Sequence, residues 1–273
     1  MSHRLTWDDT GNKKYTLGIH NVVLFVADPT AETGYASGVA WDGVSAVNES
    51  PSGAEANDIY ANDAKYATFR SAEQFGFTIE AYTSPEQFDQ CDGAATIGPG
   101  VKVHQQNRKP FGIAYCNTIG NDTMGMDFSE ELHLVYNATA SPSDKNNETV
   151  NESPDVSPLS WECSTTSVNV PGFKPSSHLT FYKHLMDQSD WESLLDLVWG
   201  STTNDSTLPT PAQVISMFGG NYTYTALTTE PADWDTKYYE KYYTKYGTKY
   251  TLIPRQDEAP EFVSGQYYER DED

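Results

Sequence analysis

The stretch FGFTIEAY, residues Phe75 to Tyr82, alternates two kinds of side chain. The odd-numbered positions are apolar, and they are Phe75, Phe77, Ile79 and Ala81. The positions between them carry glycine, threonine, glutamate and tyrosine. Successive side chains of a β-strand point to opposite faces of the sheet, so this period of two predicts a strand with one buried face.

Similar short runs, separated by turn-forming residues, continue on both sides of this strand. They include YTLGI, VVLFVAD, YASGVAWDG and AKYATF before it, and RKPFGIAYCNTIG, ELHLVYNATA, LSWECSTTSVNV and SHLTFYK after it. This spacing is typical of a mainly β protein, and 273 residues suffice for one large β-sandwich or two smaller domains. In ELHLVYNATA, His133 lies between two leucines, which predicts that its side chain is on the exposed face of a strand.

Two segments near the C-terminal third predict helices. Ser189 and Glu192 have the spacing of a capping box, and apolar residues then recur at helical intervals. Thr210 and Pro211 suit the cap and first position of a second helix, which Gly219 would end. The stretch SPEQFDQCDG predicts a short helical turn. We expect both helices to pack on the sheet.

The composition excludes several classes of function. Acidic residues outnumber basic ones by 39 to 17, which gives a net charge of -22 and opposes the phosphate neutralisation that tight nucleic-acid binding needs. The chain has no GxSxG, HExxH or phosphate-binding glycine loop, and its six histidines are scattered, so we predict no catalytic residue, no cofactor and no metal site. Three unevenly spaced cysteines, Cys91, Cys116 and Cys163, indicate ordinary thiols. No signal-peptide-like or membrane-spanning run is present, which favours a soluble cytoplasmic product.

A polar stretch of some twenty residues, Asp42 to Asp63, interrupts the aromatic runs. Three interpretations compete: a disordered linker, a ligand-binding loop, or an arm that docks on a neighbouring subunit. Because strand-like runs flank the stretch on both sides, the linker is the weakest of them.

The segment 219–273 has a different composition, rich in tyrosine and lysine, and we predict that it is a separate module. It contains a weak internal repeat, and KYYTKYGTKYTLI predicts a hairpin that turns near Tyr246 and Gly247. Lysines interleaved with tyrosines could stack on nucleic-acid bases, but the segment is acidic overall. The candidate surface-contact residues are Tyr238, Tyr239, Tyr242 and Tyr243, and contact with sugars or a cell surface stays open.

Four stretches, taken in order, resemble the major tail protein of long, flexible-tailed bacteriophages that infect Gram-positive bacteria. They are WDGVSAVNESPSGAEANDIYANDAKYATFRSAEQFGFTIEAY, GVKVHQQNRKPFGIAYCNTIGNDTMG, ELHLVYNATASPSDK and WECSTTSVNVPGFKPSSHL. The resemblance covers roughly Val39 to Phe218, and the terminal DWDTKYYEKYYTKYGTKY is similar to an appendage at the end of such proteins.

The resemblance implies a tail-tube fold, a mainly β sandwich or barrel with a flanking α-helix, in residues 1–218, and a small tyrosine-rich β appendage in residues 219–273. It implies six-membered rings whose inner sheets join into one barrel, stacked into a hollow tube through which genome DNA passes without specific binding. Residues 42–63 would be the arm between rings, with Trp41, Asp42, Asn48, Pro51, Ile59 and Tyr60 as candidate interface residues. Expected partners are other copies of the chain and the tape measure, tail terminator and distal tail proteins, with no membrane. The expected location is the virion tail, assembled in the host cytoplasm.

Two rival functions remain at this point. The tyrosine-rich end suggests a carbohydrate- or cell-surface-binding β-sandwich. The excess of acidic residues and the Asn-x-Ser/Thr sequons suggest a halophilic or secreted β-sandwich enzyme.

Overall fold

A computed structural model describes residues 7–143, 145, 147, 149, 156 and 158–218, and the strands at 224–227, 245–246, 249–250 and 267–270. The chain divides into two compact units. The first consists of residues 1–168 and 177–208, and the second of residues 169–176 and 209–273. The predicted boundary between residues 218 and 219 stays a prediction, because most of the later segment lies outside the described residues.

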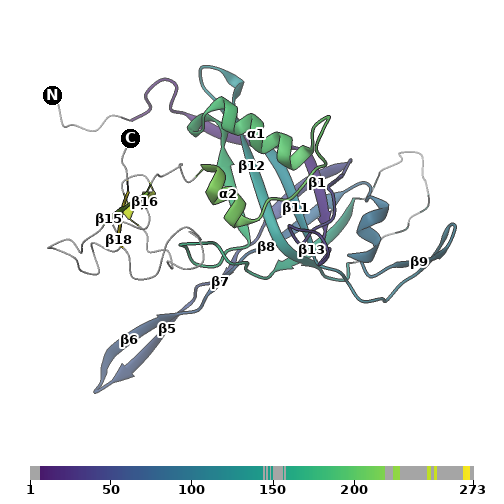
Figure 1. Cartoon of the computed structure of the whole chain (residues 1–273). Coiled ribbons are helices and arrows are strands. Elements are labelled where there is room, and N and C mark those ends of the chain that lie inside the picture. The colour runs from purple at the N-terminus through teal and green to yellow at the C-terminus, as the bar shows by residue number, and fades with distance from the viewer. Residues whose placement is uncertain are drawn as a thin grey trace. The chain divides into compact units, whose positions relative to one another are not determined.

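The first unit is built on one antiparallel, eight-stranded sheet, so the mainly β prediction is confirmed (Figure 1). Seven strands follow the order β2-β1-β11-β12-β13-β8-β3. The eighth strand, β14, lies off this path and pairs with β12. Their bounds are β1 (Lys14–Val26), β2 (Val39–Ala40), β3 (Val44–Glu49), β8 (Gly76–Ala81), β11 (Phe111–Asn121), β12 (Gly125–Ala140), β13 (Leu159–Thr165) and β14 (His178–Tyr182).

Two-stranded ladders and short helices complete the described elements. The ladders are β4 (Ser52–Gly53) with β7 (Glu73–Gln74), β5 (Ala56–Ala61) with β6 (Ala64–Arg70), β9 (Ala95–Gly98) with β10 (Val101–Val103), β15 (Tyr224–Leu227) with β18 (Tyr267–Arg270), and β16 (Lys245–Tyr246) with β17 (Lys249–Tyr250). The helices are the 3-10 turns η1 (Glu86–Gln90) and η2 (Lys183–Leu185) and the α-helices α1 (Gln188–Trp199) and α2 (Pro211–Phe218). The helical turn predicted in SPEQFDQCDG is confirmed by η1.

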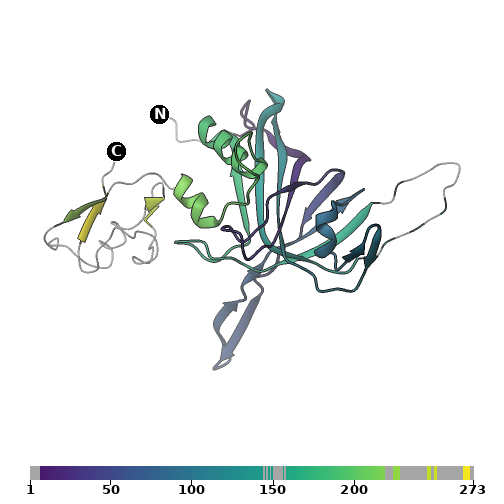
Figure 2. The ribbon, with the colours of Figure 1, turned by 45° about the vertical axis from the view of Figure 1, so that its right-hand side comes forward.

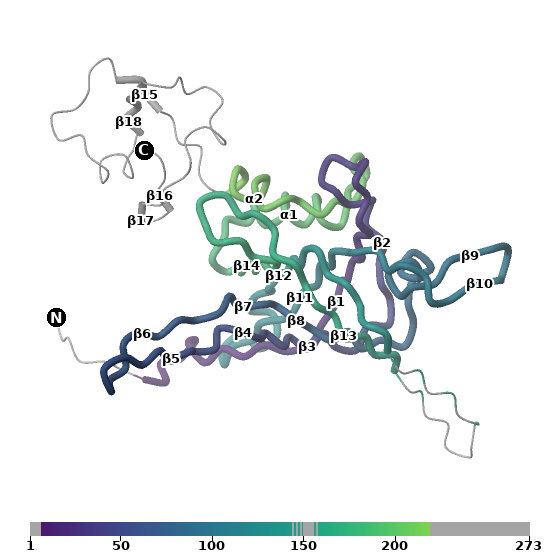
Figure 3. Tube along the Cα trace, turned by 90° about the horizontal axis from the view of Figure 1, so that it is seen from below, coloured from purple at the N-terminus to yellow at the C-terminus, as the bar shows by residue number. Residues whose placement is uncertain are grey.

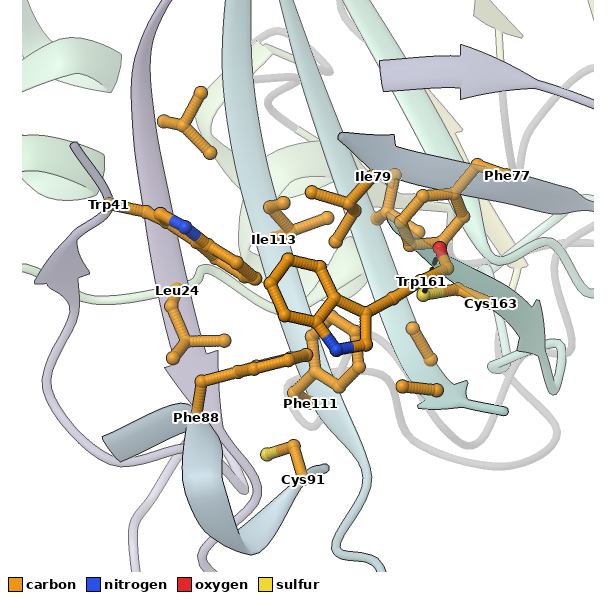
Figure 4. Packing of buried hydrophobic residues seen from close by; sticks show 14 of the residues in the cluster. Leu24, Trp41, Phe77, Ile79, Phe88, Cys91, Phe111, Ile113, Trp161 and Cys163 are labelled. Atoms are coloured by element: carbon orange, nitrogen blue, oxygen red, sulfur yellow. Dashed lines mark hydrogen bonds between the residues drawn. The ribbon is translucent and has the colours of Figure 1, made fainter. Parts of the chain in front are cut away.

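The alternation that predicted β8 is confirmed. Phe77, Ile79 and Ala81 are fully buried, and they face an inner core made by the concave side of the sheet (Figure 4). Trp41, Phe88 and Trp161 form a cluster in this core, with ring centroids 4.5 to 5.7 Å apart. Aromatic pairs in such tilted and edge-on arrangements add to the burial of their area. This core therefore holds the two ends of the sheet together.

The opposite face of the central strands is also buried. It carries six apolar residues of the other parity, which are Val23, Phe25, Ala114, Cys116, Leu132 and Leu134. Helix α1 covers this face with Trp191, Leu194 and Val198, whose spacing of three and four places them on one side of the helix (Figures 1 and 2). The predicted packing of this helix on the sheet is confirmed.

The two helix starts differ in how well the sequence predicted them. The capping box predicted at Ser189 is wrong, because α1 begins earlier, with Asp187 in the cap position. Ser189 lies inside the helix, where its carbonyl oxygen accepts a hydrogen bond from the Ser193 hydroxyl. In α2, which belongs to the second unit, the Gln213 amide donates to the Thr210 hydroxyl, and Gln213 Oε1 accepts from the Thr210 amide. These reciprocal bonds confirm Thr210 as the cap and Pro211 as the first helical residue.

In the C-terminal segment, β16 and β17 pair antiparallel, with Tyr246 opposite Lys249. This pairing confirms the hairpin that was predicted near Tyr246. Tyr238, Tyr239, Tyr242 and Tyr243 lie outside the described residues.

Candidate assembly surface

A long hairpin leaves the main sheet between β3 and β8 (Figures 1 and 3). The backbone amide of Ser50 donates to the carbonyl oxygen of Gly76, and the ladders β4–β7 and β5–β6 then continue the pairing outward. We call residues 52–74 the arm hairpin. At roughly 3.3 Å per strand residue it extends on the order of 30 Å from its root. The arm is thus an ordered hairpin and not a linker.

The tip of the arm hairpin is a tight turn at Asn62 and Asp63. Both residues have positive φ angles, 53° and 59°, as the two central positions of a type I′ turn require. Asparagine and aspartate tolerate this conformation better than most residues, which explains why the chain reverses here. Ala61 and Ala64 close the ladder on either side of the turn.

One face of the arm hairpin is polar and internally paired. Asp58 Oδ1 lies 2.8 Å from Lys65 Nζ and accepts a 2.7 Å hydrogen bond from the Thr68 hydroxyl. The Lys65 ammonium, and to a smaller extent the Thr68 hydroxyl, lowers the pKa of Asp58. These contacts fix the cross-strand register on this face.

The other face is apolar and exposed. Ile59 lies opposite Ala67, and Phe69 lies opposite Asn57, so these side chains share a face. Ile59 is 45% exposed and Phe69 is 59% exposed. Near the tip, Tyr66 and Tyr60 are exposed as well, and Tyr60 lies opposite Lys65 of the polar face. A two-stranded hairpin is only marginally stable in water on its own, so this apolar face is suited to cover by another molecule.

The main sheet offers a second surface for association, at its borders. β1 pairs with β2 only at Val23 and Leu24, so residues 14–21 of β1 have no strand partner on that side among the described residues. A further edge is formed by β14, which lies off the main strand order and pairs with β12. The pairings of β1 with β11, β11 with β12, and β12 with β14 are all antiparallel. A second copy that places its β1 beside β14 would therefore continue the alternation of strand directions.

The six predicted interface residues fall in four different environments. Trp41 is 3% exposed in the inner core, where its Nε1 donates to the carbonyl oxygen of Thr83, so it does not lie on the subunit surface. Asn48 belongs to β3 in the main sheet, where its side-chain amide donates to Glu80. Asp42 and Pro51 are exposed next to strand ends. Ile59 and Tyr60 lie together on the arm hairpin.

Sequence reasoning missed the second strand of the arm. Residues 44–49 of the predicted arm belong to the main sheet, whereas Tyr66 and Phe69 of β6, beyond its predicted end, belong to the arm hairpin. The available signal was the Asn62–Asp63 pair, a hairpin-turn dipeptide between two strand-like runs.

Comparison with family models and with curated protein sequences identifies no relative of this chain. Within the described residues, no helix is both long enough and apolar enough to cross a membrane.

Proposed function

We propose that this chain is the major tail protein of a long-tailed bacteriophage, a structural protein that polymerises as stacked rings into the hollow tail tube. The observation that carries the proposal is the arm hairpin, which is ordered, projects from the sheet and exposes Ile59 and Phe69 on one face. In the assembly this face packs on a subunit of the adjacent ring. Because both side chains are already about half buried, covering the rest contributes about 1.5 to 3 kcal/mol per arm before the entropy cost of association.

The borders of the main sheet support ring formation. Antiparallel addition of β1 from one copy to β14 of the next satisfies backbone groups at an edge that would otherwise attract non-specific partners. This contact is head-to-tail, and its repetition closes a ring when the rotation from one copy to the next divides a full turn. The resemblance of the sequence suggests six subunits per ring.

The charge of the chain suits the passage of DNA. With a net charge of -22, the assembled subunits repel the phosphate backbone, so genome DNA can slide through the lumen without adhering. Other partners would be the tape measure, tail terminator and distal tail proteins, and assembly would take place in the host cytoplasm. The function requires no catalytic residue and no cofactor.

Negative-stain electron microscopy and measured mass in solution test this proposal on the full-length protein. We expect rings and tubes from the native chain. The double variant Ile59→Asp/Phe69→Asp should stay folded but lose stacking, since both side chains are exposed in the subunit. Val156→Asp, which places a charge at an exposed apolar position outside the arm, is the matched control and should assemble normally.

A native chain that is monomeric at high concentration would overturn the proposal. If such a monomer bound glycans, it would instead favour the carbohydrate-binding module. Tubes of normal length from the double variant would show that the arm hairpin is not the contact between rings.

A further inference from the structure

Three side chains with metal-binding atoms converge on the concave side of the main sheet. Glu49 comes from the end of β3, His133 from β12 and His178 from β14. One ligand atom of each lies within 4.8 Å of the other two. His133 Nδ1 lies 2.9 Å from His178 Nε2 and 3.5 Å from Glu49 Oε1. Because these residues lie far apart in the sequence, they form no local metal-binding motif.

Two of the three ligand separations are close to those of a tetrahedral ion. Zinc binds histidine nitrogen and carboxylate oxygen at about 2.0 to 2.2 Å, so two ligand atoms of a tetrahedral site lie about 3.4 Å apart. The separation of His133 Nδ1 and Glu49 Oε1 already has this value within about 0.1 Å, and the two histidine nitrogens need to part by about 0.5 Å. The ligand atoms of the third pair, His178 and Glu49, lie within 4.8 Å of each other.

Neighbouring groups orient the first ligand ring. The Asn117 side-chain nitrogen donates to the carbonyl oxygens of Cys116 and Gly18, so its amide oxygen faces His133, where it lies 3.3 Å from Nε2. This oxygen accepts the proton of Nε2, which leaves the lone pair of Nδ1 directed at His178 and Glu49. A ligating histidine usually donates its second ring nitrogen to an oxygen in this way.

Aromatic rings fix the positions of both histidines. Tyr115 stacks on His133 with ring centroids 4.6 Å apart, and Phe75 lies over His178 at 4.4 Å. The Tyr115 hydroxyl also donates a 2.8 Å hydrogen bond to Glu49 Oε1, so the carboxylate is oriented as well. Each of the three ligands therefore has at least one neighbour that limits its freedom.

One carboxylate and two imidazole nitrogens make up a donor set that suits a transition-metal cation. Burial, and then the nearby His178, lowers the pKa of His133 to about 4, and burial also lowers the pKa of His178. The side chain of Glu49 is 37% exposed, which gives an ion a path from solvent. The prediction that His133 lies on an exposed face is wrong, because α1 covers one side of β12 and the curved sheet encloses the other.

We propose that Glu49, His133 and His178 form a binding site for one zinc-type divalent ion, with solvent as the fourth ligand. Two nitrogens and one oxygen favour zinc and related transition metals over calcium or magnesium, which prefer oxygen. The ion ties the end of β3, from which the arm hairpin leaves, to β12 and β14. It therefore stiffens the root of the arm.

The test uses the full-length chain without a histidine tag, treated with chelator and then titrated with ZnCl2 by calorimetry. We expect one zinc per chain, and tetrahedral-type visible absorption when Co2+ replaces zinc. Glu49→Gln and His178→Gln should each weaken zinc binding at least tenfold. His104→Ala, at an exposed histidine outside the cluster, is the control and should bind as the native chain does.

Loss of binding in a variant counts only if its circular dichroism matches that of the native protein. Tyr115→Phe provides a milder variant that keeps all three ligands, and it should weaken zinc binding about tenfold through the freed carboxylate. Absence of zinc binding by the native chain, or binding unchanged in Glu49→Gln and His178→Gln, would overturn the site. The titration is repeated on the Ile59→Asp/Phe69→Asp variant, so its result does not depend on whether the chain forms tubes.

Discussion

The Tyr115 hydroxyl donates a 2.8 Å hydrogen bond to a carboxylate oxygen of Glu49, across the concave side of the sheet. The bond joins the middle of β11 to the last residue of β3, where the chain leaves the sheet to form the arm hairpin. Tyr115 is 1% exposed, so its hydroxyl has few alternatives to this partner. The bond ties the root of the arm to the core.

Replacing Tyr115 with phenylalanine tests this link. The change removes the hydroxyl and keeps the ring on His133, so we expect a loss of about 1 to 2 kcal/mol in the free energy of unfolding. Urea denaturation of the chain in chelator measures it. Tyr60→Phe, on the exposed part of the arm, is the control and should change stability by less than about 0.5 kcal/mol.

Trp41 is expected to stabilise the subunit and not the contact between subunits. Trp41→Ala opens a cavity beside Phe88 and Trp161, which should lower the free energy of unfolding by about 3 to 5 kcal/mol. Chemical denaturation of the unassembled protein measures this loss. Tyr60→Ala, also an aromatic-to-alanine change, should leave the subunit's stability nearly unchanged because Tyr60 is 69% exposed. Equal losses in the two variants would contradict the assignment of Trp41 to the core.

Removal of the arm should separate folding from assembly. Deleting residues 54–72 and joining the stumps of β4 and β7 with an Asn-Gly turn keeps the whole of β3 and β8. We expect a folded subunit, by circular dichroism and thermal denaturation, that forms no tubes in electron micrographs. Deleting residues 47–57 instead would remove half of β3, so that variant should lose stability as well.

Truncation after Gly219 tests the C-terminal module. We expect the truncated chain to fold and to form tubes that lack outward projections, because the main sheet and α1 precede this point. Micrographs of tubes from the truncated and full chains, compared for outer diameter, measure the effect. Failure of the truncated chain to fold would show that the module belongs to the body of the subunit.

The three cysteines should be inert in the folded protein. Cys91, Cys116 and Cys163 are free and buried, and burial raises the pKa of each thiol to about 12. At pH 8 we expect no alkylation by iodoacetamide until a denaturant is added, as measured by mass spectrometry. The folded state holds these protons more tightly than the unfolded state does, so this contribution to stability falls as the pH rises from about 9 toward 12. Rapid labelling of the native protein would contradict the burial.

Sequence patterns located single elements well where one local signal dominates. The period of two in residues 75–82 determined β8 and its buried face, and Thr210 with Pro211 determined the start of α2. The prediction of the start of α1 failed because two capping signals overlap there. Asp187 and Ser189 can both cap a helix, and the apolar pattern does not choose between them. The prediction that His133 is exposed failed for another reason: the alternation of residue types along a strand cannot reveal that both faces of the strand are covered.

The sequence by itself determined the mainly β class, the identity of most strands and the acidic character of the chain, because these depend on residue type and on spacing within a few positions. Only the tertiary structure decided that Trp41 belongs to the core, that Ile59 and Phe69 share an exposed face, and that Glu49, His133 and His178 meet. Those relationships depend on the register of strands far apart in the chain, and a shift of one residue in any ladder would reverse the face on which each side chain lies.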